Sequence, residues 1–146
     1  MREMRYRGKA VETDEFVYGI PVRDGSGDWF IPNDKYFVGT ALIPETITIS
    51  TGRKDKNNIE IFEGDIVVIP SAISDECCKY LILYNENTMA FELHLVHEES
   101  NSFSYVSNTF PSFFTSYAYC PGEIEVVGNM FDTVPRLRKE DVFEDV

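Results

Sequence analysis

The amino-acid sequence predicts a mainly β protein: a small, partly open β-barrel, SH3-like in size, with hairpin insertions and a short C-terminal tail or helix. Aromatic residues make up 14% of the 146 residues, and aromatic side chains favour half-buried pleated surfaces. Short runs of alternating apolar and polar residues recur, separated by clusters of Gly, Asn, Asp and Pro, which is typical of hairpins and small barrels. A hydrophobic fraction of 43% supplies the core.

Alternation predicts three strands in the N-terminal half, over residues 4–11, 16–22 and 46–50. Since alternate side chains of a strand point to the same side, one face of the second strand carries Phe16, Tyr18, Ile20 and Val22. In the third strand we expect Ile47 and Ile49 to point inward, and the hydroxyls of Thr46, Thr48 and Ser50 outward. A turn at 24–28 precedes an apolar stretch at 29–31, and residues 32–44 are predicted to be irregular.

In the C-terminal half, a polar turn over residues 52–58 leads to Ile59, Ile61 and Phe62, which we expect to anchor the chain. The β-branched run 66–69 predicts a strand that is covered on both faces. The clearest hairpin joins 80–84 to 89–96, with Phe91, Leu93 and Leu95 on its core face. Residues 70–76 and 98–109 are predicted as loops and 123–127 as the last strand; for 110–119, strand and short helix both stay open.

We predict one β-rich domain over residues 1–134 and an acidic C-terminal tail over 135–146, for which a short helix is one alternative. The cations of the tail come first and its anions last, an order that opposes the helix dipole. We therefore expect a tail helix to be marginal, or to be ordered only by docking on a partner.

The chain has 25 acidic and 13 basic residues, a net charge of −12. Such a field repels nucleic-acid phosphates and anionic membranes, so neither bulk nucleic-acid binding nor membrane association is predicted. The first residues lack the apolar region of a signal peptide, and no apolar run approaches the ~20 residues of a membrane helix. We therefore expect a cytoplasmic protein. Reduced thiols are predicted at all three cysteines, namely Cys77, Cys78 and Cys120.

Four stretches carry a family pattern: RYRGKA at 5–10, FVYG at 16–19, PETITISTGRKDKNNIEIFEGDIVVI at 44–69 and EIEVVGNMFD at 123–132. On these stretches, somewhat less than half the chain, the sequence resembles the YopX-type family of phages and prophages in Gram-positive bacteria. It departs from the family pattern at 48–50 and 133–135. The resemblance implies a small β-rich fold, a mobile-element origin in a bacterial host cell and self-association. The family has no established activity, so the resemblance implies no catalytic residues.

Several candidate sites have both a functional and a structural interpretation. Arg53, Lys54 and Lys56 are candidates for contact with an anion or nucleic acid, but three cations supply few phosphate contacts, and a solvated turn is favoured. Glu63 and Asp65 suggest a cation or acid/base site. A structural interpretation explains the sequence Glu63-Gly64-Asp65 better: Gly64 permits a positive φ, and Asp65 accepts hydrogen bonds from nearby backbone amides. The spacing of zinc-ligand types is wrong for a zinc site at Cys77, Cys78, His94 and His97.

No catalytic constellation, cofactor or metal is predicted, and no small-molecule ligand. The sequence predicts an accessory protein that acts by protein–protein binding, either as a homo-oligomer or on a host protein, in one version as an acidic DNA mimic. The alternatives are a weak nucleic-acid-binding barrel and a small cation-dependent hydrolase that uses Asp55, Glu63 or Asp65. The candidate partner interface is aromatic and comprises Phe110, Phe113, Phe114 and Tyr117. Ordinary core packing is the favoured interpretation for most of these aromatics and for Trp29, Phe30 and Tyr119, which leaves one or two residues of the 110–119 group for an oligomer interface.

Overall fold

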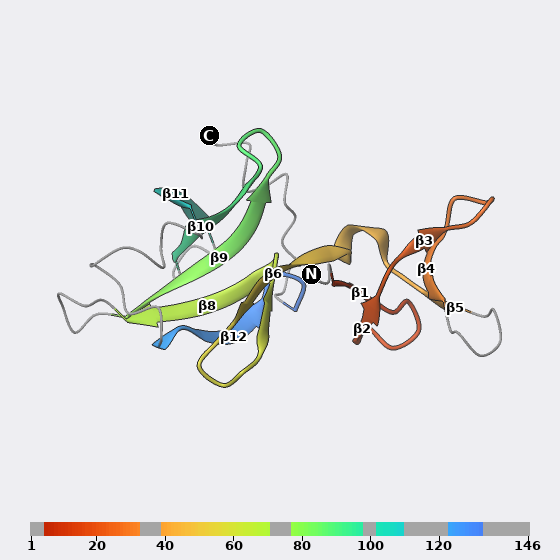
Figure 1. Cartoon of the computed structure of the whole chain (residues 1–146), viewed down its shortest axis with the longest axis horizontal. Helices are drawn as coiled ribbons and strands as arrows, with labels where there is room; N and C mark the ends of the chain where they lie inside the picture. Colours follow the sequence, from red (N-terminus) through yellow and green to blue (C-terminus); the bar gives the residue numbers. More distant parts are fainter. Residues whose placement is uncertain (1–4, 33–38, 71–76, 98–101, 110–122, 133–146) are drawn as a thin grey trace. The chain divides into compact units, whose positions relative to one another are not determined.

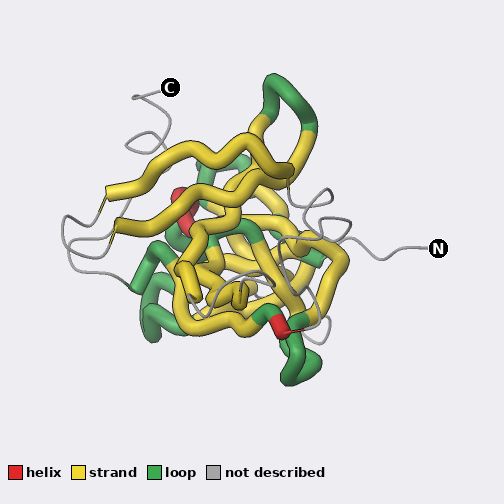
Figure 2. The backbone as a smooth tube through the Cα atoms, turned by 90° about the vertical axis from the view of Figure 1, so that its left-hand side faces the viewer, coloured by secondary structure: helices red, strands yellow, loops and turns green. Residues whose placement is uncertain are grey.

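The computed structural model describes residues 5–32, 39–70, 77–97, 102–109 and 123–132 (Figure 1). These residues form twelve β-strands and one short 3-10 helix, with no α-helix among them, and Figure 2 shows how strand predominates. All strand pairing is antiparallel, in three sheets. The mainly β prediction is confirmed. The partly open barrel stays a prediction, because none of the three strand orders within the described residues closes on itself.

The chain divides into two compact units, residues 1–52 and 53–146. The predicted domain over 1–134 therefore contains the first unit and most of the second. The predicted tail over 135–146 lies outside the described residues.

The first unit contains five strands, the 3-10 helix and the start of a sixth strand. They are β1 (Tyr6–Lys9), β2 (Phe16–Gly19), β3 (Val22–Arg23), β4 (Trp29–Pro32), β5 (Gly39–Ala41), η1 (Pro44–Thr46) and β6 (Thr48–Lys54). β1 lies between β2 and β6, with Tyr6 opposite both Gly19 and Ile49. β3, β4 and β5 form a separate three-stranded sheet. β6 continues into the second unit, where β7 (Glu60–Phe62) is its neighbour.

Two predictions for the first unit are wrong. The strand predicted over 16–22 is broken into β2 and β3, because Pro21 has no amide hydrogen to donate to a continuing ladder. The stretch predicted to be irregular over 32–44 contains β5. β5 consists of small residues with little alternation, and its pairing with β4 makes it a strand.

The predicted orientation of the segment 46–50 is also wrong. Thr46 is fully buried and Thr48 is buried, whereas Ile47 and Ile49 are only half-buried. Thr46 belongs to η1, and its Oγ1 accepts a hydrogen bond from the Lys9 amide (2.8 Å) and donates one to the Ile43 carbonyl (2.6 Å). Because this hydroxyl makes both hydrogen bonds inside the protein, its burial does not leave a polar group without a partner.

The second unit is built on a five-stranded sheet in the order β11-β10-β9-β8-β12 (Figure 1). Its strands are β8 (Asp65–Pro70), β9 (Cys77–Asn85), β10 (Ala90–His97), β11 (Ser102–Thr109) and β12 (Glu125–Asn129). The predicted hairpin is confirmed as β9 and β10, and the last strand begins two residues later than predicted. The loop predicted over 98–109 is wrong for 102–109, where β11 pairs with β10. Phe103, Tyr105, Val106 and Thr109 favour a strand, and the loop prediction gave too much weight to the serines and asparagine between them.

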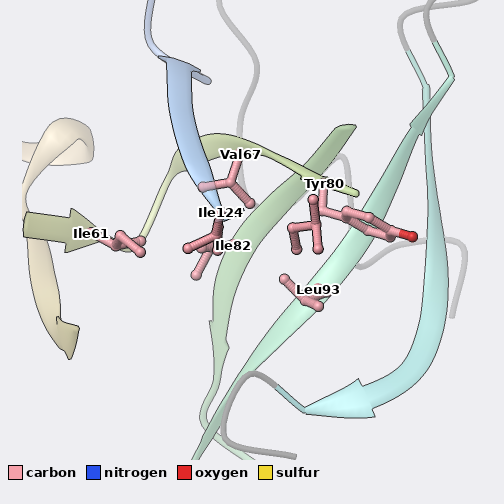
Figure 3. Packing of buried hydrophobic residues seen from close by; sticks show 7 residues of the cluster. Ile61, Val67, Tyr80, Ile82, Leu93 and Ile124 are labelled. Atoms are coloured by element: carbon pink, nitrogen blue, oxygen red, sulfur yellow. The ribbon is translucent and has the colours of Figure 1, made fainter. Parts of the chain in front are cut away.

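The core of the second unit lies on one face of this sheet (Figure 3). It consists of Ile61, Val67, Ile69, Tyr80, Ile82, Leu93 and Ile124. Phe91 and Leu95 pack against it, which confirms the predicted core face of the hairpin. Each such aliphatic side chain stabilises the fold by about 1.5–3 kcal/mol on full burial. Ile59, expected to anchor the chain, is 50% exposed, because it ends the polar turn before β7 begins.

Candidate functional site

The predicted basic turn lies where β6 ends, and a carboxylate organises it. Asp55 is only 7% exposed. Its Oδ1 accepts the amides of Asn57 (2.8 Å) and Ile59 (2.9 Å), and its Oδ2 accepts the amide of Val126 on β12 (3.0 Å). Hydrogen bonds from side chain to backbone therefore close this turn, in agreement with the structural interpretation of residues 52–58.

The three candidate cations of this turn are all exposed, but they do not form one surface. The Nζ of Lys56 lies 3.3 Å from the Oε2 of Glu125, so its charge is partly neutralised. Arg53 and Lys54 are consecutive residues of β6, and consecutive side chains of a strand point to opposite faces. Anion contact by these three residues stays a prediction.

The carboxylates of Glu63 and Asp65 hold strand ends together. Gly64 between them has a φ of +89°, as predicted, and a Cβ there would lie 3.1 Å from the ring of Phe131. The Oδ2 of Asp65 accepts the amide of Phe62 (2.8 Å), and the Oε2 of Glu63 accepts the amide of Tyr84 (2.9 Å). Both carboxylates are buried, so the geometry gives them a structural task.

A buried acid and a buried imidazole lie on one face of β10. Glu92 and His94 are 2% and 1% exposed, and the Nε2 of His94 lies 3.6 Å from the Oε1 of Glu92. The Nδ2 of Asn85 donates to the same Oε1 (3.1 Å). Burial lowers the pKa of His94 below its usual 6.5, and the nearby Glu92 only partly offsets this effect. The pair is neutral at the imidazole and shielded from solvent.

A zinc site has no support in this arrangement. No group of three His, Cys, Asp or Glu side chains within the described residues is placed to hold a metal ion. Cys77 and Cys78 begin β9, His97 ends β10, and Cys120 lies outside the described residues.

Two buried cations lie against an aromatic ring in the first unit. The guanidinium carbon of Arg7 is 4.0 Å from the centre of the Phe16 ring, and the Nζ of Lys9 is 5.1 Å from it. The same Nζ donates to the carbonyl of Asp14 (3.0 Å) and lies 3.5 Å from its Oδ2. These cations stabilise the β1–β2 hairpin from inside, and they are not displayed for a nucleic acid.

The first unit also contains an apolar pocket of about 430 Å³. Its lining comes from β1, the β2–β3 link, β4, η1 and the residue that follows η1, and consists of Tyr6, Ile20, Pro21, Trp29, Pro44 and Ile47. Ile20 is 69% exposed, so the pocket has an open, apolar rim. Tyr18 and Val22, on either side of Ile20 in sequence, are also exposed.

No pattern in the amino-acid sequence predicts this pocket. Trp29 was expected to take part in ordinary packing, Pro21 lay inside the strand predicted over 16–22, and Pro44 lay in the stretch predicted to be irregular. Pro21 lies in the link between β2 and β3 and Pro44 begins η1, and these two separate segments give no sign in their sequence that they meet at one pocket. The predicted interface residues Phe110, Phe113, Phe114 and Tyr117 lie outside the described residues.

Comparisons with known proteins give one family match. A family model described as YopX protein matches residues 8–138. No curated protein matches the chain. Across the described residues, no helix has the length and apolar character needed to cross a membrane.

Proposed function

The chain belongs to the YopX family, and we propose that it is a prophage accessory protein that acts by binding another protein rather than by catalysis. The observation that carries this proposal is the apolar pocket of the first unit, with Ile20 exposed at its rim. Open concave apolar surfaces are the usual sites of recognition, and adjoining exposed apolar side chains mark protein-binding surfaces.

The positions of the acidic residues support a binding role. Asp55, Glu63 and Asp65, which a hydrolase would use, all accept hydrogen bonds from backbone amides. Their arrangement serves the turns and strand ends that surround them.

The test compares the wild-type chain with two matched variants in affinity capture from a lysate of a Gram-positive host, with light scattering on each sample. Ile20→Arg places a charge on the pocket rim. Ile59→Arg makes the same change at a similarly exposed isoleucine of the second unit. We expect a specific bound protein, or an oligomer of the chain itself, that Ile20→Arg removes and Ile59→Arg retains.

The proposal is wrong if the wild-type chain is monomeric and retains no specific protein. It is equally wrong if both variants retain the same proteins and the same oligomer as the wild type. Circular dichroism spectra of the variants, matching that of the wild type, establish that a loss of binding is not a loss of fold.

A further inference from the structure

Two methionines of the second unit have opposite surroundings. Met89 lies in the turn between β9 and β10 and is 78% exposed, whereas Met130 is 2% exposed. We infer that Met89 is a site of reversible oxidation, at which a hydroperoxide converts the thioether into a sulfoxide while the protein stays folded. This inference goes beyond the proposed function and uses no residue of the apolar pocket.

Met89 has a backbone conformation that its side chain disfavours. Its φ is +55°, and the other non-glycine residues with a positive φ in the described part of the chain are Asp14 and Asn58. Short polar side chains such as these tolerate the left-handed region better than larger ones. Burial does not offset the cost at Met89, because its side chain lies in solvent. Strain of this kind clusters at functional positions, and packing gives no reason for a methionine here.

The turn keeps its shape without the Met89 side chain, because Asn85 organises it. The Oδ1 of Asn85 accepts the amide of Asn87 (2.9 Å), and its carbonyl accepts the hydroxyl of Thr88 (3.5 Å). The Nδ2 of Asn85 donates to the Oε1 of buried Glu92 (3.1 Å), which ties the turn to β10. The loop itself extends beyond the end of β9 (Figure 1). An oxygen atom added to the sulfur of Met89 therefore meets solvent and leaves these hydrogen bonds in place.

Met130 is placed where the same change would disturb the fold. Its amide donates to the carbonyl of Gly64 (2.8 Å), and a Cβ at Gly64 would lie 3.6 Å from its Sδ. The sulfur therefore packs closely against the turn between β7 and β8. A sulfoxide is polar, and burial of a polar group without a hydrogen-bond partner costs free energy. Peroxide reaches Met130 only when this part of the structure opens, which slows the reaction.

The proposed reaction is a two-electron oxygen transfer. A lone pair of the Met89 sulfur attacks one oxygen of the peroxide, and the O–O bond breaks as the S–O bond forms. The leaving hydroxide takes the proton of the transferred hydroxyl group, so hydrogen peroxide yields one sulfoxide and one water. The sulfur is oxidised and the peroxide is reduced. A thioether has no proton to lose, so the step needs no thiolate and no neighbouring base, and exposure of the sulfur is what selects Met89.

The exposed position also makes the reaction reversible. Methionine sulfoxide reductases, one enzyme for each epimer at sulfur, return the sulfoxide to the thioether. Two thiols become a disulfide in this step, and the sulfoxide oxygen leaves as water. Such an enzyme has to reach the side chain, and an exposed turn permits this. Oxidation therefore changes the surface of the turn from apolar to polar, and reduction changes it back.

The test treats the full-length protein with hydrogen peroxide at neutral pH and maps the products by peptide mass. Mapping assigns each added oxygen to a residue, so oxidation of the cysteines, or of Met1 and Met4 outside the described residues, is counted separately. We expect Met89 to gain one oxygen at least about ten times faster than Met130, with an unchanged circular dichroism spectrum. A mixture of both reductases with dithiothreitol should then remove this oxygen.

Two variants and a denaturant provide the controls. Met89→Leu keeps an apolar side chain and should lose only this product, with the rate at Met130 unchanged. Met89→Gly should raise the melting temperature, because glycine adopts a positive φ freely. In a denaturing concentration of urea, Met89 and Met130 should react at similar rates, because the fold alone causes the difference between them.

The inference is overturned if Met89 and Met130 of the folded protein are oxidised at the same rate, or if their rates still differ in urea. It is also overturned if oxidation of Met89 unfolds the chain, or if the reductases leave the sulfoxide in place. A melting temperature of Met89→Gly at or below that of the wild type would show that the Met89 side chain serves the fold, and would equally contradict the inference.

Discussion

Two aspartates close turns in the same way but in different surroundings. Asp24 accepts the Ser26 hydroxyl (2.6 Å) and the amides of Ser26 and Asp28 (2.9 and 3.0 Å) in an exposed turn. These bonds, the Ser26 hydroxyl first, hold the pKa of Asp24 below its usual 3.8. Asp55 also accepts three hydrogen bonds, all from amides, but it is buried, and one of the three amides belongs to β12. The two residues therefore differ in burial and in how far away in the sequence their hydrogen-bond partners lie.

The first prediction follows from this difference. Asp55→Ala should lower the free energy of unfolding by about 2 kcal/mol, because it leaves partly buried amides without an acceptor. Asp24→Ala should cost clearly less, because water replaces the lost acceptor in an exposed turn. Urea unfolding of both variants measures this, provided that the m-value is unchanged. Equal losses for the two variants would contradict the structural role of Asp55.

At the same scale, the Glu63–Asp65 turn shows what local sequence can predict. The positive φ of Gly64 and the bond from a backbone amide to Asp65 were both expected, and both are present. Such features depend on residues within three positions of one another, and steric limits on backbone angles determine them. The partner of Glu63, the amide of Tyr84, lies 21 positions away and could not be predicted from the turn.

At the scale of the element, β10 is buried at Glu92 and His94 on the face opposite its apolar core residues. The sequence predicted the core face of this strand, with Phe91, Leu93 and Leu95. Alternation reports which residues share a face, but not whether a second layer covers it. Polar residues on one face of a strand predict that this face is exposed to solvent, whereas in the structure Glu92 and His94 are buried.

The second prediction concerns the pH dependence that this burial creates. The pKa of His94 is lower in the folded state than its usual 6.5, so the unfolded chain binds the proton more readily. The contribution of the neutral imidazole to stability is therefore complete above about pH 6.5 and is lost as the pH falls below that value towards the folded-state pKa.

The measurement is urea unfolding of the wild-type chain and of His94→Gln between neutral and mildly acidic pH. The carboxylates titrate in both proteins, so only the difference between the two curves reports on His94. The wild-type chain should lose stability more steeply on acidification than the variant. Parallel curves would show that His94 does not carry this pH dependence.

At the scale of the whole molecule, the negative charge is unevenly divided. Residues 53–146 contain 17 acidic and 7 basic residues, a net charge of −10, while residues 1–52 contain 8 and 6, a net charge of −2. Self-repulsion of like charges destabilises a compact state. The second unit therefore carries most of this electrostatic cost, and the apolar pocket lies in the unit that carries little of it.

The third prediction is that added salt stabilises the protein. Raising NaCl from roughly 0.01 M to 0.15 M shortens the Debye length from about 30 Å to about 8 Å and screens the repulsion. The melting temperature should rise by about 3 °C, the shift that roughly 1 kcal/mol gives in a chain of this size. KCl at equal ionic strength should give the same rise. A melting temperature that falls with salt would mean that attractive ion pairs dominate.

The sequence by itself determined the mainly β class, the β9–β10 hairpin with its core face, and the turns at Gly64 and Asp55. Each depends on local steric rules or on two-residue periodicity, which adjacent residues encode. Only the tertiary structure decided that Thr46 and His94 are buried, and that Trp29, Pro21 and Pro44 surround one pocket. These features depend on which distant segment lies opposite each residue, and the contacts between such segments leave no periodic signal in the chain.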